Sequence, residues 1–481
     1  MLFNSFDFAL FLPIALLLYW FVVGKNLRLQ NLLIVIASYV FYGWWDWRFL
    51  SLIVFSTLVD YTVGILLSKE EKALKRKLLL WTSIGVNLGF LGFFKYYNFF
   101  LDNFVSAFSF FGMEINANSL NIILPVGISF YTFQTLSYTI DVYKRKLQPT
   151  RDFIAFGAFV SFFPQLVAGP IERASNLLPQ FYKKRSFDKL KAFDGLRQIL
   201  WGLFKKVVIA DNCAQYANEI FNNSADHNGS TLALGALMFA FQIYGDFSGY
   251  SDIAIGTSRL FGFNLMQNFA FPYFSRDISE FWRRWHISLS TWFRDYVYIP
   301  LGGSRGGLWM KIRNTFIIFV VSGFWHGANW TFIAWGALNA IYFLPVLLTN
   351  NNRKNLNVVA EGKYLPSLKE AALMLSTFGL TVIAWIFFRA ENMGHALGYL
   401  SEIFSGSIVK PIENAPVGFF FILMYFIVVE WFNRHKQHGL EQGQTSLQAY
   451  KLLDRILIFI TFWMIVLWHS SNEVEFIYFQ F

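Results

Sequence analysis

Residues 315–348 read TFIIFVVSGFWHGANWTFIAWGALNAIYFLPVLL and contain no Asp, Glu, Lys or Arg. This apolar run is longer than the roughly 17–25 residues that a helix needs to cross a lipid bilayer. It therefore predicts helix embedded in a membrane rather than the core of a soluble domain.

The rest of the chain repeats this composition. Of the 481 residues, 55% are hydrophobic and 15% are charged, whereas a soluble chain carries about 25% charged residues. We count about eleven spans and predict an all-α polytopic membrane protein that forms one domain over residues 1–481. We expect glycines to interrupt block 230–256 and Pro164 to turn block 153–168 into a re-entrant hairpin. The other apolar blocks are 6–23, 29–44, 50–67, 78–100, 120–143, 153–168, 196–210, 230–256, 368–388, 417–432 and 456–468.

The net charge of +10 comes from short basic clusters between these blocks. They lie at 25–28, at 69–77 and at 144–146, whereas the loop with Asp102 and Glu114 has no Lys or Arg. This is the pattern of basic cytoplasmic loops, not of a nucleic-acid-binding surface. An alternating path then predicts an extracytoplasmic N-terminus, with 6–23 as the first permanent span and not a cleaved signal. The single cysteine, Cys213, is expected to be a small buried apolar residue, and no metal site is expected.

Three polar segments stand out, because polar groups within membrane spans are costly and are functional candidates. Segment 242–252 places Asp246 and Asp252 among glycines, which suits either a site or a close helix-packing seam. Segment 277–301 is predicted to be one amphipathic helix that carries Arg283 and Arg284. His286 lies on the apolar side of that helix, as a core residue or as an active group.

The third segment, 322–330, lies in the quoted run and centres on His326. At about 1.5 Å per residue, His326 would lie about 21 Å along a continuous helix from residue 312, near the middle of the bilayer. The glycines on either side would let a ligand or a second helix approach closely. Trp325, Trp330 and Asn329 would line a cavity there, although a lone histidine can also be a structural hydrogen-bonding residue.

These segments carry a family signature. The chain resembles the membrane-bound O-acyltransferases, and within them the bacterial alginate O-acetyltransferase branch. The matching stretches are 129–134 (SFYTFQ), 163–171 (FPQLVAGPI), 242–252 (QIYGDFSGYSD), 280–290 (EFWRRWHISLS), 298–303 (YIPLGG), 324–330 (FWHGANW) and 476–480 (FIYFQ).

The resemblance implies a ring of membrane helices around a central tunnel, with a catalytic core over about 120–345. It implies that His326 is catalytic and that His286 is a second functional residue. It also implies a bacterial inner-membrane location, a cytoplasmic thioester donor such as acetyl-CoA, and no bound cofactor. The resemblance further implies an extracytoplasmic partner protein of the serine-esterase type and a polysaccharide acceptor.

Acyl transfer needs a base and groups that stabilise the developing oxyanion. We predict that His326 is the base, that His286 orients or relays, and that Asn329 is an oxyanion donor. Arg283, Arg284, Lys311 and Arg313 would bind donor phosphates, unless they only mark the membrane interface. D-alanyl transfer to teichoic acid, a transporter or channel, and a passive scaffold for export remain alternatives.

Overall fold

The computed structural model describes residues 1–110, 119–120, 122–442, 448–469 and 476–477. The described residues form helices, turns and loops and no strand, so the predicted all-α class is confirmed. They divide into two compact units, residues 1–192 with 258–266 (unit 1) and residues 193–257 with 267–481 (unit 2). The single domain over 1–481, the ring and the tunnel stay predictions.

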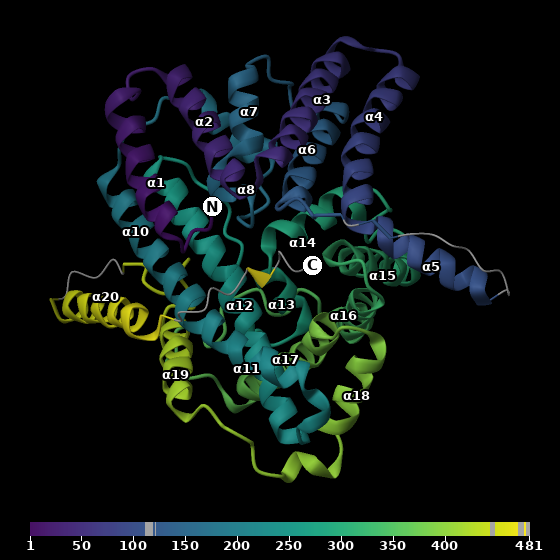
Figure 1. Cartoon of the computed structure of the whole chain (residues 1–481), viewed down its shortest axis with the longest axis vertical. Coiled ribbons are helices and arrows are strands. Elements are labelled where there is room, and N and C mark those ends of the chain that lie inside the picture. Colours follow the sequence, from purple (N-terminus) through teal and green to yellow (C-terminus); the bar gives the residue numbers. More distant parts are fainter. Residues whose placement is uncertain (111–118, 121, 443–447, 470–475, 478–481) are drawn as a thin grey trace. The chain divides into compact units, whose positions relative to one another are not determined.

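Unit 1 is built from the helices drawn in purple and blue in Figure 1. They are α1 (Phe6–Leu17), α2 (Leu27–Asp46), α3 (Leu50–Lys69), α4 (Ala73–Leu91), α5 (Tyr97–Phe110), α6 (Ile128–Tyr143), α7 (Phe153–Ser161), α8 (Phe163–Leu166) and α9 (Ala174–Leu177).

A buried carboxyl group joins three of these helices. Asp60 of α3 accepts hydrogen bonds from Ser83 and Asn87 of α4 and from Thr139 of α6, the last two at 2.9 Å. Between apolar helices in lipid, such polar contacts are a main source of specific association. The hydrogen bonds therefore set how α3, α4 and α6 pack.

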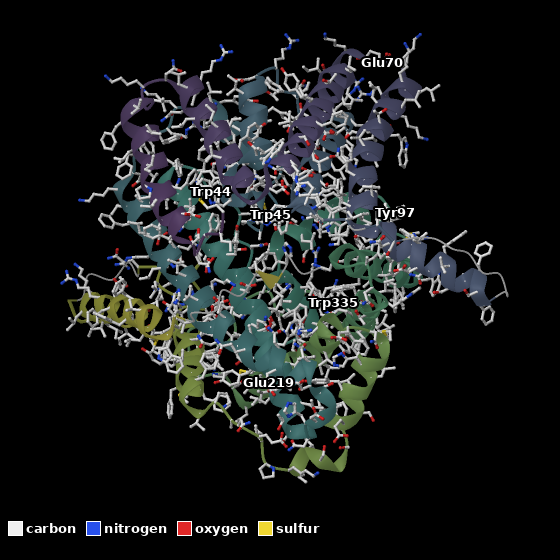
Figure 2. The ribbon with its side chains drawn as sticks, in the orientation of Figure 1. Trp44, Trp45, Glu70, Tyr97, Glu219 and Trp335 are labelled. Atoms are coloured by element: carbon white, nitrogen blue, oxygen red, sulfur yellow. The ribbon has the colours of Figure 1, made fainter. Side chains whose placement is uncertain are left out.

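The basic clusters lie at one end of unit 1. Arg145 forms an ion pair with Glu71 at 2.6 Å, and Arg76 donates to the carbonyl oxygen of Tyr143 at 2.7 Å. The turn between α1 and α2 lies at the same end (Figure 1). Figure 2 labels Glu70 there and Tyr97 at the other end of α4. The three clusters thus share one end, as the alternating path requires; Glu114 lies outside the described residues.

Unit 2 holds the other helices, and the chain changes unit within α10 (Lys189–Leu203) and within α12 (Gly229–Leu260). Its remaining helices are α11 (Asp211–Asn222), α13 (Ile278–Arg284), α14 (Ile287–Phe293), α15 (Gly307–His326), α16 (Trp330–Leu348), α17 (Leu368–Arg389), α18 (Met393–Ile403), α19 (Val417–Phe432) and α20 (Gln448–Trp468). Two π-helical segments, η5 (Phe204–Ala210) and η8 (Arg294–Tyr298), interrupt the regular helices.

Four helical stretches of the described residues are long and apolar enough to cross a membrane: Leu27–Lys69, Ala73–Phe110, Trp330–Leu348 and Leu368–Arg389. The first runs through α2, a short 3-10 turn and α3. Apolar helices of fewer residues are Phe6–Val22, Phe153–Leu166 and Val417–Phe432. A multi-pass membrane protein is therefore supported, whereas the count of about eleven spans stays a prediction.

Several predicted blocks have different bounds in the structure. Helix α6 begins at Ile128, not at residue 120, because Gly127 has φ 75°. Block 153–168 is broken at Phe162, where α7 ends and α8 begins, and not at Pro164, which lies in the first turn of α8. The re-entrant hairpin stays a prediction. The expected interruption of 230–256 is wrong, since α12 is one continuous helix of 32 residues. Its glycines serve close packing instead. The buried Cys213 is confirmed.

Candidate functional site

His326 is the last residue of α15, not a residue within a longer helix. After Gly327, which is extended at φ −162° and ψ 152°, the Asn329 side chain accepts a hydrogen bond from the Thr331 backbone N–H at 3.1 Å. An asparagine at this position is a strong N-cap, so a new helix starts here. The prediction of one helix through 315–348 is therefore wrong, and His326 lies at the turn of a helical hairpin.

The two helices of this hairpin are in backbone contact. A Cβ atom on Gly323 would lie 2.2 Å from the carbonyl oxygen of Phe332, and one on Gly336 would lie 2.3 Å from that of Phe319. Only glycine fits at such a distance. The glycines near His326 were predicted to let either a ligand or a second helix approach closely. At Gly323, the structure shows a second helix.

Aromatic rings surround His326. Its ring is edge-to-face with Trp335 at 5.4 Å and with Phe388 at 5.5 Å between centroids, and 8% of the residue is exposed. Trp385 of α17 contacts both of these rings, at 5.7 Å and 5.2 Å. Figure 2 labels Trp335, which is 1% exposed, among the packed side chains of unit 2.

We call Trp285, Trp335, Trp385 and Phe388 the aromatic cluster. The sequence argument named Trp325 and Trp330 instead; Trp325 is half-buried and Trp330 is 55% exposed. Helical spacing could have identified Trp335, because position 335 lies on the same helix face as position 331 at the start of α16. Nothing in the sequence near His326 indicates that α17 contributes Trp385 and Phe388, because these residues lie about sixty positions further along the chain.

His286 lies between two short helices. It has φ 43° and ψ 54°, the left-handed region, and it separates α13 from α14. The predicted single amphipathic helix over 277–301 is therefore wrong. Because the helix is broken at His286, shared helical faces cannot be assigned across it.

The hydrogen bonds of His286 determine which ring nitrogen carries the proton. Asn268 Oδ1 accepts from the Ser288 backbone N–H at 3.3 Å and from its hydroxyl at 2.8 Å. His286 Nδ1 lies 3.1 Å from the same oxygen. Because that oxygen is an acceptor, Nδ1 carries the hydrogen and Nε2 of the neutral ring holds a lone pair. The ring is 3% exposed and edge-to-face with Phe247 at 4.6 Å.

The two histidines belong to one arrangement in unit 2. Both imidazoles are buried, at 3% and 8% exposed. The aromatic cluster also connects their surroundings, because Trp285, next to His286 in sequence, packs on Trp385 at 5.0 Å. The structure therefore brings together the two residues that were predicted as catalytic.

A cluster of buried charges lies where η5 packs on α12. Lys205 pairs with Asp252 at 2.5 Å, and Lys206 pairs with both Asp211 and Asp246 at 2.8 Å. The π-helical turn of η5 carries both lysines, and a buried charge requires such partners. Both the aspartates and the two lysines of apolar block 196–210 are visible in the sequence, but nothing in the sequence paired them with each other.

Glycines bring α10 and α12 together beside this charge cluster. A Cβ on Gly249 would lie 2.7 Å from the Gly202 carbonyl oxygen, and one on Gly256 would lie 2.4 Å from that of Gly195. Segment 242–252 therefore forms the packing seam that was one of its two interpretations. A role of Asp246 and Asp252 in substrate binding stays a prediction.

The predicted phosphate-binding arginines contact protein acceptors. Arg283 donates to Ser279 and to the backbone carbonyls of Asn352 and Asn355, all within 2.8 Å. Arg284 forms an ion pair with Glu280 at 2.9 Å. These contacts hold the loop at 352–357 against α13. Phosphate binding by either arginine stays a prediction.

Asn329 has structural contacts at both ends of its amide. Besides capping α16, it donates through Nδ2 to the carbonyl oxygen of Glu391 at 2.8 Å. These contacts hold the turn after His326 against the residues that follow α17. Its role as an oxyanion donor stays a prediction.

Comparison with known proteins adds an independent result. The family model "membrane-bound O-acyltransferase family" matches residues 143–373. A probable alginate O-acetylase from Pseudomonas putida is 38% identical, over 100% of both chains. Another from Pseudomonas aeruginosa is 43% identical over 84% of this chain and 75% of its own. A peptidoglycan O-acetyltransferase from Helicobacter pylori is 37% identical over 83% and 79%.

The chain therefore belongs to the membrane-bound O-acyltransferase family. It is a multi-pass membrane acyltransferase, and the buried residues His286 and His326 both lie in the region that the family model matches.

Proposed function

We propose that this protein moves an acetyl group from a cytoplasmic thioester, acetyl-CoA, across the membrane for O-acetylation of an extracytoplasmic polysaccharide such as alginate. The observation that carries the proposal is the pair of buried histidines joined by the aromatic cluster, one of which has its tautomer fixed by Asn268. The printed names of relatives at 38–43% identity support an acetyl group and a polysaccharide acceptor.

In the proposed reaction, an acceptor hydroxyl attacks the carbonyl carbon of the thioester. His326 takes the hydroxyl proton as the new C–O bond forms. The C–S bond then breaks, and the leaving thiolate takes up a proton from the histidine. His286 Nε2, which holds a lone pair, can orient the proton acceptor or relay the proton. The surrounding rings exclude water, which would otherwise hydrolyse the thioester.

The location of the reaction follows the same proposal. The basic clusters at one end of unit 1 would face the cytoplasm, which places the N-terminus outside the inner membrane of a bacterium. The acetyl group would leave on the opposite side to a second, extracytoplasmic transferase of the serine-esterase type. That partner would pass the group to the polysaccharide.

The test uses purified full-length protein, acetyl-CoA labelled in the acetyl group, and unacetylated alginate to supply the acceptor hydroxyl. We expect release of CoA and transfer of label by the wild type, and loss of both in His326→Ala. His435, an exposed histidine, supplies the matched control His435→Ala, which should behave as the wild type. Thermal unfolding and gel filtration in detergent check that each variant folds. Wild-type rates in His326→Ala would end the catalytic assignment.

Three alternatives give different results in the same experiment. D-alanyl transfer to teichoic acid would require a carrier-protein thioester, and the wild type would then be inactive with acetyl-CoA. A transporter or channel would show flux in vesicles without breaking the thioester, and a scaffold would support acetylation with His326 replaced.

A further inference from the structure

Two buried polar groups near the aromatic cluster around His326 have no hydrogen-bond partner among the described residues. They are Nε1 of Trp385 and Oγ1 of Thr331, on residues that are 2% and 0% exposed. Buried polar side-chain atoms in native proteins are nearly always paired, because an unpaired group loses its water and gains nothing in return. Two such groups around one reactive residue therefore suggest that a ligand supplies the missing acceptor.

The ring geometry restricts where the Trp385 N–H can point. Trp335 stacks on the face of Trp385 with an interplanar angle of 19°, whereas an indole N–H lies in the plane of its ring. The N–H therefore lies parallel to the stacked ring and is not directed into the face of Trp335. The aromatic cluster encloses His326 through Trp335 and Phe388.

Thr331 lies on the helix that carries Trp335. It is four residues before Trp335 on α16, so the two side chains are neighbours on one helix face. Its backbone N–H is already used by the Asn329 cap. Its hydroxyl has no partner among the described residues and remains able to donate.

We propose that Trp385 Nε1–H and Thr331 Oγ1–H donate hydrogen bonds to the acyl carbonyl oxygen of the substrate at His326. Attack by the acceptor hydroxyl turns that oxygen into an oxyanion, while the hydroxyl proton passes to His326. When the C–S bond breaks, the oxyanion becomes the carbonyl of the new ester and the thiolate is protonated. Donors that are in place before the reaction stabilise this charge most effectively. The inference rests on the proposed function, and it assigns to these two residues the role that Asn329 was predicted to have.

The test measures kcat and KM for acetyl-CoA with full-length protein. Trp385→Phe keeps an aromatic ring and removes the N–H, and Thr331→Val keeps the shape and removes the O–H. We expect each change to lower kcat about 100-fold, since one oxyanion donor contributes about 10²–10³. KM should change by less than about threefold, because the hydrogen bonds strengthen mainly in the transition state.

Matched controls separate chemistry from packing. Trp201 Nε1 is also buried and unpaired, but its ring stacks on Phe204 and Phe426, outside the aromatic cluster. Thr381 is buried on α17 and donates to its own helix at 2.8 Å. Trp201→Phe and Thr381→Val should therefore keep wild-type kcat. A second probe is ethyl-CoA, the thioether without the carbonyl oxygen. Its inhibition constant should be the same for the wild type and all four variants.

The outcomes distinguish this inference from the proposed function. If Trp385→Phe and Thr331→Val keep kcat within about threefold of the wild type, the donors are wrong while the acetyltransferase stands. An equal loss in Trp201→Phe would show that packing is responsible, and would overturn the inference as well. A wild type that leaves acetyl-CoA intact would contradict the proposed function and, with it, the inferred carbonyl site.

Discussion

At the scale of single residues, the conformation of His286 depends on Asn268. A non-glycine residue with positive φ is held there by its surroundings. Asn268 contributes to that hold by accepting from Ser288 and from His286, while its own Nδ2 donates to Ser251 at 3.1 Å. One amide thus fixes both the backbone path and the tautomer of the imidazole.

Replacing Asn268 tests this dependence. In Asn268→Ala, the Nδ1–H of His286 loses its acceptor and the other tautomer becomes accessible. We expect kcat for acetyl transfer to fall about 10–100-fold, the size typical of residues that orient a functional histidine. Asn268→Asp keeps the acceptor oxygen and should recover most of the rate. Equal losses in both variants would show that the effect is on packing, not on the tautomer.

His227 predicts a pH dependence of stability. It lies in the loop before α12 and contacts Glu413 at 2.9 Å and Glu219 at 3.2 Å. Burial disfavours the charged imidazole, but the hydrogen bonds and charges of Glu413 and Glu219 outweigh it and raise the pKa of His227. The stabilisation is thus complete below the ordinary pKa of 6.5 and is lost as the pH rises through the raised value.

Thermal unfolding of the wild type and of His227→Gln from pH 5.5 to 8.5 measures this effect. The difference in unfolding temperature should be largest at the acid end and should shrink as the pH rises. It should be small, since both glutamates are about half-exposed and solvent screens the pair. A difference that grows with pH would contradict the assignment.

At the scale of elements, the α15–α16 hairpin depends on glycine. A Cβ at Gly323 would clash with the backbone of Phe332, whereas one at Gly379 in α17 would meet nothing within 4 Å. We expect Gly323→Ala to lower the free energy of unfolding by about 1–3 kcal/mol, because the helices must separate. Gly379→Ala, the control, should be neutral or stabilising, since alanine favours helix. Thermal unfolding in detergent compares the two; equal stability of both variants would contradict the close contact.

Sequence reasoning predicted the helical class and the two histidines, but not the helix ends beside them. A local signal existed for the end at His326, because an asparagine before a new apolar run is a typical N-cap. The apolar composition of the surrounding run concealed it. No local signal existed for the left-handed His286, since its conformation depends on Asn268, eighteen residues away and in another segment.

At the scale of the whole molecule, composition and basic clusters were enough to predict a multi-pass membrane protein. Span bounds were less accurate because hydropathy responds to apolar residues and not to backbone conformation, as the unwound segment before Ile128 shows. The sequence did not indicate which residues from distant segments would become hydrogen-bond or ion-pair partners. Lys206 was conspicuous in the sequence, but its two carboxylates come from α11 and α12.

The order of synthesis has a consequence for the hairpin. Helices α15 and α16 contact each other through a turn of three residues, so they can form and insert as a pair as soon as both have left the ribosome. His326 then already has Trp335 beside it, but Phe388 and Trp385 arrive only with α17, some forty residues later. The nascent hairpin therefore carries its histidine without the rest of its enclosure. Any reactivity that depends on a dry environment is switched on only when α17 docks.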